Sequence, residues 1–194
     1  MKTMLVTCCA LILTASGCSK YDALVAADQE CERTWADVEA ELQRRYDLVP
    51  NLIATVKGSA AHEQQTLAAV VAARAQATSI KMSSDDLQDP EKMAAFTKAQ
   101  SELKGSLSRL LLVQEQYPDL KANAAFHDLQ IQLEGTENRI LRAREEYNRT
   151  VGAYNTELRR VSGIAINKIT GKPFKVRLFY SAPAESQVNP KVSF

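Results

Sequence analysis

Apolar side chains recur every three or four residues along the first third of the chain. The series follows one helix face: Trp35, Val38, Leu42, Arg45, Val49, Leu52 and Val56. Alternating steps of three and four are typical of a helix that packs against other helices. Pro50 interrupts the segment and leaves two possibilities open: one long helix that kinks there, or two helices, the second capped by Asp47.

Two further helices are predicted before the middle of the chain. Residues 60–80 are rich in alanine, which has the highest helix propensity and whose small side chain lets helices approach closely. After a loop at 82–86, Asp89-Pro90-Glu91 is a typical helix start, with a capping side chain and a proline in the first turn. That helix is expected to end near Gln116 and to present one apolar face: Met93, Phe96, Leu103, Leu107, Leu110, Leu111 and Val113.

The longest periodic segment is predicted to form one helix from about Leu120 to about Ile169. Its stripe is Leu133, Glu137, Ile140, Arg144, Tyr147, Val151, Tyr154, Leu158, Val161 and Ala165. The period is lost past Gly171, where Phe174, Val176, Leu178, Phe179 and Tyr180 could dock as an extended strip. Residues 181–194 are expected to be a mobile tail. The chain is therefore predicted to be an all-α, up-and-down four-helix bundle with one very long C-terminal helix.

Charged residues interrupt both stripes. Because an isolated buried charge costs several kcal/mol, such residues must pair or stay hydrated. The sequence therefore predicts a structural polar network that fixes helix register, and truncation of Arg144 to alanine is expected to cost several kcal/mol. The proposed members are Arg45, Asn51, Glu63, Glu137, Asn138 and Arg144.

Two Tyr-Asn pairs, Tyr147-Asn148 and Tyr154-Asn155, repeat after seven residues. They could form an aromatic and amide face that grips a peptide or a partner helix. In the simpler interpretation, which we favour because both tyrosines lie on the stripe, the tyrosines fill the core and each asparagine meets water or caps the network.

The chain begins like a bacterial lipoprotein signal. Lys2 precedes an apolar run from Met4 to about Ala15, and small residues then lead to Cys18. As a helix, residues 4–17 would span only about 21 Å against roughly 30 Å of hydrocarbon, which favours a cleaved leader over an anchor. We expect residues 1–17 to be the signal peptide and Cys18 to be acylated. Residues 18–27 would hold the lipidated N-terminus and the start of the first helix.

Composition narrows the choice of function. The chain carries 24 basic and 23 acidic residues, and loss of the leader removes one lysine and no acid, so the mature chain is neutral and has no electrostatic footprint for nucleic acid. Cys31 would be the one cysteine left after processing and is expected to pack as a small hydrophobe. The two histidines, His62 and His127, lack the spacing of a metal motif, and no glycine-rich phosphate loop is present. No catalytic residue, metal ligand or cofactor is predicted.

Three blocks of sequence resemble the LemA family of bacterial envelope proteins. The first holds Trp35, Arg45-Tyr46-Asp47-Leu48-Val49-Pro50-Asn51-Leu52, Val56-Lys57-Gly58, His62-Glu63 and Ala73-Arg74. The second is Glu115-Gln116-Tyr117-Pro118-Asp119-Leu120-Lys121-Ala122-Asn123 with Phe126. The third is Leu133-Glu134-Gly135-Thr136-Glu137-Asn138-Arg139-Ile140, Ala143-Arg144, Tyr147-Asn148 and Tyr154-Asn155.

The resemblance implies a helical bundle at residues 28–171, held at a membrane outside the cytoplasm, and it does not imply an enzyme. An irregular tail would follow at 172–194. Ser19 after the acceptor cysteine, in place of aspartate, hints at the outer membrane. We therefore expect a lipid-anchored structural or interaction module whose partners are membrane lipid and other envelope proteins. The alternatives are a binding protein for a peptide or hydrophobic ligand, and an enzyme built on the Arg/Glu network, which would need an open pocket beside Glu63, Glu137 or Arg144.

Overall fold

The structure is a computed structural model that describes residues 2–60, 63–169 and 174–181. Over these ranges the helices are α1 (Lys2–Ser59), α2 (Gln64–Ser79), α3 (Pro90–Leu112), α4 (Pro118–Lys121), α5 (Ala124–Arg159) and α6 (Val161–Ile169). The 3-10 turns η1 (Asp86–Gln88) and η2 (Val113–Gln116) flank α3. The described residues include no strand, and the all-α prediction is confirmed.

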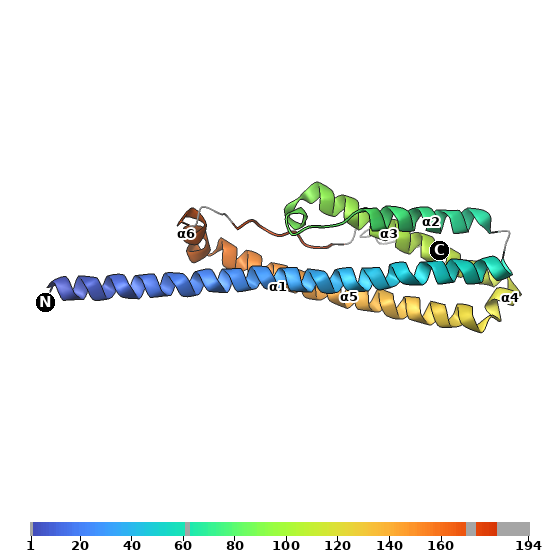
Figure 1. Ribbon diagram of the computed structural model, residues 1–194, viewed down its shortest axis with the longest axis horizontal. Coiled ribbons are helices and arrows are strands. Elements are labelled where there is room, and N and C mark those ends of the chain that lie inside the picture. The colour runs from blue at the N-terminus through green and yellow to red at the C-terminus, as the bar shows by residue number, and fades with distance from the viewer. Residues whose placement is uncertain (1, 61–62, 170–173, 182–194) are drawn as a thin grey trace, which may run out of the picture.

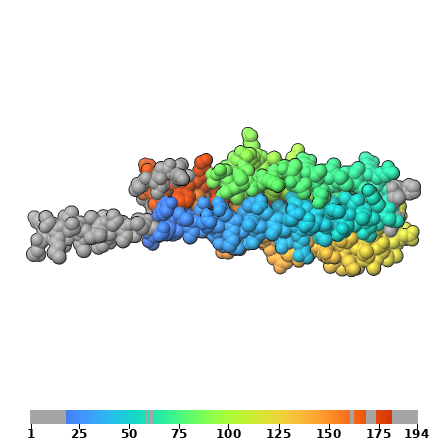
Figure 2. All heavy atoms as spheres, in the orientation of Figure 1, coloured from blue at the N-terminus to red at the C-terminus, as the bar shows by residue number. Residues whose placement is uncertain are grey.

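Four long helices run up and down along one axis (Figure 1). α1 and α5 lie side by side over most of their length, and α2 pairs with α3 as a second layer. The space-filling view shows α1 flanked by the α2–α3 pair and by α5 (Figure 2). α4 turns the chain at one end, and α6 packs on both α1 and α5 near the other.

Helix α1 passes through Pro50 without a break, which settles the choice that the sequence left open. A proline inside a helix has no N–H to donate to the carbonyl four residues earlier, here that of Tyr46. Arg74 of α2 donates its Nε–H to this carbonyl oxygen at 2.9 Å. A neighbouring helix thus supplies a donor in place of the missing one. The predicted stripe of α1 is buried throughout, at Trp35, Val38, Leu42, Arg45, Val49, Leu52 and Val56.

The start of α3 is as predicted. The alanine-rich helix α2, however, does not pack through most of its alanines as expected. Asp89 accepts hydrogen bonds from the backbone of Glu91 and Lys92, and Pro90 occupies the first turn. Most of the predicted α3 face is buried, with Leu111 only half-buried. In α2, by contrast, most alanines face solvent, because Leu67, Val70 and Ala77 make the buried contact.

The prediction of one helix from 120 to 169 is wrong, because this segment forms α4, α5 and α6. Asn123 caps α5 and accepts a hydrogen bond from the Phe126 backbone at 3.2 Å. At its other end, Arg160 adopts an extended conformation and α6 folds back on α5. Gly163 permits this close approach, since a Cβ there would lie 2.5 Å from the Glu157 carbonyl oxygen. Ala165, a predicted member of the stripe, is consequently exposed.

Residues 174–181, here called the strap, run as an extended segment along the bundle (Figure 1). The Leu178 backbone N–H donates to the Leu87 carbonyl of η1 at 2.9 Å. The strap docks mainly through Arg177 and Tyr180, which are buried, whereas Val176 and Phe179 are exposed. An extended docked strip is therefore present, although a charged side chain is one of its two anchors. Residues 182–194, the rest of the predicted tail, lie outside the described residues.

Candidate functional site

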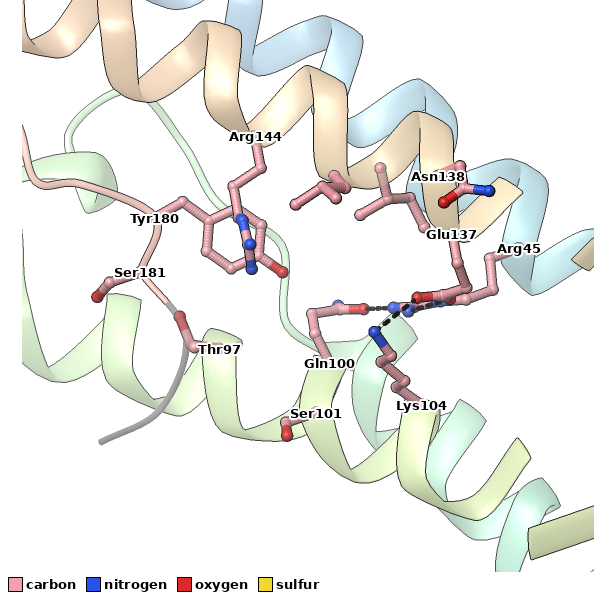
Figure 3. A pocket seen from close by; sticks show the side chains of 12 residues that line it. Arg45, Thr97, Gln100, Ser101, Lys104, Glu137, Asn138, Arg144, Tyr180 and Ser181 are labelled. Atoms are coloured by element: carbon pink, nitrogen blue, oxygen red, sulfur yellow. Dashed lines mark hydrogen bonds and ion pairs between the residues drawn. The ribbon is translucent and has the colours of Figure 1, made fainter. Parts of the chain in front are cut away.

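Part of the expected polar network meets around Arg45, which is 2% exposed. Its Nη1 lies 2.9 Å from Oε1 of Glu137 on α5. Lys104 of α3 approaches the other oxygen of Glu137 at 3.6 Å (Figure 3). The network thus ties α1, α3 and α5 together through one half-buried carboxylate.

Other predicted members lie elsewhere. Glu63 lies just before α2, away from Arg45. It accepts a hydrogen bond from the Tyr117 hydroxyl at 2.9 Å. Asn51 and Asn138 are exposed. Arg144 is half-buried with its guanidinium 5.9 Å from the centre of the Tyr180 ring, and among the described residues it forms no ion pair. The six residues therefore do not form one network. The large loss of folding free energy that was expected for truncating Arg144 is now expected for truncating Arg45.

Sequence reasoning missed Gln100, which completes the network. Gln100 accepts a hydrogen bond from Arg45 Nη2 and donates to the Tyr46 hydroxyl at 2.5 Å. Burial raises the pKa of Tyr46, so this hydroxyl stays neutral. A signal for Gln100 was available, since it continues the three-four spacing of α3 between Phe96 and Leu103.

A hollow of about 330 Å³ opens beside this network, between α3 and α5 (Figure 3). Glu137 and Arg144 both line it, so the open pocket that a catalytic interpretation required is present. Its lining, which consists of described residues, offers hydroxyl, amide, carboxylate and cationic groups but neither histidine nor cysteine. The arrangement is better suited to holding an anion than to generating a nucleophile.

A second site lies at the Tyr-Asn pairs, which grip the strap. Asn155 donates from Nδ2 to the Arg177 carbonyl at 2.8 Å and accepts from the Arg177 N–H at 3.0 Å. Asn148 brackets Tyr180 in the same way, at 3.0 and 2.8 Å. Asn167 of α6 brackets Phe174 at 2.9 and 2.7 Å. Three amide side chains thus satisfy both backbone groups of every third strap residue. We call this arrangement the asparagine clamp.

The tyrosines of the pairs reinforce the clamp from within the core. The Tyr147 hydroxyl donates to the Leu178 carbonyl at 3.0 Å, and the Tyr154 hydroxyl donates to the Lys175 carbonyl at 2.9 Å. Burial raises the pKa of both tyrosines far above the ordinary value, which keeps the two hydroxyls as donors. The tyrosines therefore fill the core, as the simpler interpretation had it. Their asparagines hold an extended segment of the same chain instead of meeting water.

The spacing of the clamp follows from helix and strand geometry. Asn148 and Asn155 lie seven residues apart, which is about 10.5 Å along a helix. Their strap partners Tyr180 and Arg177 lie three residues apart, which is about 10 Å along an extended chain. A seven-residue repeat on α5 therefore matches a three-residue repeat on an antiparallel strap.

Arg177 anchors the middle of the strap in an acidic pocket. Its guanidinium lies 2.7 Å from Asp28 and 3.1 Å from Glu32 of α1, 3.1 Å from the Ser84 hydroxyl and 5.9 Å from the Tyr154 ring centre. Burial alone would lower the pKa of Arg177, but the hydrogen bonds and charge of Asp28 and Glu32 outweigh it and raise this pKa. No sequence signal linked Arg177 to Asp28 and Glu32, which are far away in the chain.

Tyr180 anchors the end of the strap in an aromatic cluster. Its ring centre lies 6.0 Å from that of Trp35 and 5.6 Å from that of Phe96. Trp35 also packs edge-on against Tyr147 at 5.0 Å. Burial raises the pKa of Tyr180 to about 12. The strap thus closes the core between α1, α3 and α5 with one large side chain.

Replacing Asn155 with alanine should destabilise the protein by about 2 kcal/mol, because it leaves the buried N–H and C=O of Arg177 without partners. Chemical denaturation of the purified variant measures this free energy. Thr156→Ala, at the exposed neighbouring position, should change stability by less than about 0.5 kcal/mol. Equal effects of the two substitutions would contradict the role of the clamp.

Of the two cysteines considered from the sequence, the structure describes the side chain of only one. The side chain of Cys18 lies outside the described part of the structure, whereas Cys31 is fully buried and burial raises its thiol pKa, as suits a small hydrophobe. In the searched part of the chain, no helix is both long and apolar enough to span a bilayer. In the same residues, no three His, Cys, Asp or Glu side chains are grouped to hold a metal ion.

The model of the LemA family matches residues 34–194, which is most of the chain and includes the clamp and the strap. No curated protein matches the chain. Since the family model covers far more than half of the sequence, the chain belongs to the LemA family.

Proposed function

We propose that this LemA-family protein is a lipid-anchored, non-catalytic structural and protein-interaction module of the bacterial envelope, with the outer membrane as its possible site. Cys18 would carry the lipid, and the bundle would stand outside the cytoplasm. The partners would be the membrane leaflet and other envelope proteins.

The observation that carries the proposal is the continuity of α1. Cys18 and Leu24, the first buried side chain among those that the structure describes, belong to the same uninterrupted helix. Six residues of helix span about 9 Å, so an acylated Cys18 would hold the bundle close to the lipid headgroups. A protein moored in this way presents a rigid rod to its neighbours.

The exposed apolar side chains on the outer face of α2 support the proposal of a protein partner. Ala68, Ala72 and Ala75 are exposed there, and Val71 is 50% exposed. They line part of a shallow surface hollow of about 710 Å³. Exposed apolar surface of this kind is typical of protein contacts.

Acylation is tested by expressing the chain in a Gram-negative host and measuring the mass of its N-terminal peptide. We expect cleavage before Cys18, an acylated cysteine and recovery in the membrane fraction. Cys18→Ser should lose the acyl mass and leave the membrane fraction, whereas Cys9→Ser, within the leader, should change neither. An unmodified N-terminus at Cys18, or unchanged fractionation of Cys18→Ser, would refute the anchor.

The partner surface is tested with a photocrosslinking amino acid in living cells. Placed at Val71 on α2, it should give a discrete crosslinked band with another envelope protein. Placed at Ala95, an exposed position on α3, it should give little or none. No band at Val71, or equal bands at the two positions, would refute this face as the contact.

A further inference from the structure

The hollow between α3 and α5 carries more positive than negative charge. Arg45, Lys104 and Arg144 line it, and Glu137 is the one carboxylate in its lining. Arg144 and Tyr180 lie toward one end of the hollow, and Arg45, Gln100 and Glu137 lie together at the other (Figure 3).

The contacts show which of these charges is already neutralised. Arg45 uses one Nη on Glu137 and the other on Gln100, and Lys104 shares the same carboxylate. Arg144 has no hydrogen bond or ion pair within the described chain, and its guanidinium only faces the Tyr180 ring. Arg45 also keeps one buried donor, Nε, without a partner. The three cations therefore exceed the one carboxylate by two charges, and Arg144 is the cation of the hollow that has no anionic partner in the described chain.

Two aliphatic side chains lie in this otherwise polar lining, and a second hollow continues from it along the bundle. Ile140 and Leu141 line it beside Arg144, and Leu141 is 42% exposed. A second hollow of about 320 Å³ adjoins it, shares Lys104 and Glu137, and is lined by Leu111 and Leu133. The two hollows form a groove with Arg144 at one end, the Lys104–Glu137 pair between them and leucine side chains at the other end.

We propose that the first hollow binds a small organic monocarboxylate, with its carboxylate on Arg144 and its apolar body against Ile140 and Leu141. A planar guanidinium matches a carboxylate through two parallel hydrogen bonds. Arg45 and Lys104 already contact Glu137, which would repel an anion near them, so one carboxylate on the unpaired Arg144 fits better than a phosphate dianion. This inference depends on neither the lipid anchor nor a protein partner.

Calorimetric titration of the full chain with sodium hexanoate and with hexanamide tests the proposal. Hexanoate should bind saturably, and hexanamide, which has the same apolar body without the charge, at least tenfold more weakly. Arg144→Gln should weaken hexanoate binding at least tenfold, and Arg144→Lys should weaken it less. Arg142→Gln, an exposed arginine on the same helix, should leave it unchanged.

Several results would overturn the proposal. Absence of saturable binding or equal binding of hexanamide would do so on the unaltered protein, whatever the variants do. An equal loss in Arg142→Gln would show that only general charge matters. Tighter binding of hexyl phosphate than of hexanoate would overturn the assignment to a monoanion. Circular dichroism of Arg144→Gln and Arg144→Lys identifies the variants that remain folded and are therefore compared.

Discussion

Replacing Arg177 with alanine should cost about 3–5 kcal/mol of folding free energy, because truncation of one partner leaves the other charges of a buried ion pair uncompensated. The substitution strips Asp28 and Glu32 of their shared cation and empties a site in which the arginine is 1% exposed. Denaturant unfolding followed by circular dichroism measures the loss. Protection of the strap against proteolysis should fall with it, since its middle anchor is gone.

Lys175→Ala is the matched control, because Lys175 lies on the same strap with an exposed side chain and contributes only its carbonyl to the Tyr154 hydroxyl. This variant should change stability by less than about 0.5 kcal/mol. A cost for Arg177→Ala as small as that of Lys175→Ala would mean that the acidic pocket does not hold the strap.

Replacing Arg45 with alanine should cost about 3 kcal/mol, the next largest effect. The substitution removes a side chain that is 2% exposed, leaves Gln100 without its donor and leaves Glu137 with only a surface lysine. Arg45→Met, which fills the volume without charge, should cost less, since apolar residues often replace buried ion pairs at little expense.

Arg44→Ala provides the control for Arg45, because Arg44 is adjacent but exposed. It should change stability by less than about 0.5 kcal/mol. If Arg45→Met were as costly as Arg45→Ala, the charge itself and not the filled volume would dominate. If Arg45→Ala had no cost, the network would have no structural role.

Periodicity predicted most of the helical framework because burial repeats with the helix. The stripe from Trp35 to Val56 is buried throughout, including Arg45, and the Asp89-Pro90 start of α3 is confirmed. Periodicity could not show that α5 ends at Arg159, because α6 turns back through a close contact at Gly163, and this contact depends on tertiary packing.

The candidate site was only partly predictable, for a related reason. Glu137 belongs to a stripe, and so does Gln100, so their meeting with Arg45 follows from helix faces. Arg177 lies in an extended segment without periodicity, and its partners Asp28 and Glu32 are identified only by the three-dimensional path of the strap. The repeat of the Tyr-Asn pairs was visible, but the extended segment that it holds could not be read from the pairs alone.

The central claim is that the asparagine clamp makes the strap part of the folded core. Hydrogen–deuterium exchange of the intact chain, resolved to residues 174–181, tests it most directly. The clamp predicts that the amides of Arg177, Leu178 and Tyr180 exchange as slowly as those in the middle of α5, since each donates a hydrogen bond to the bundle. Exchange of these amides at the rate of an unstructured peptide, while α1 and α5 remain protected, would contradict the account.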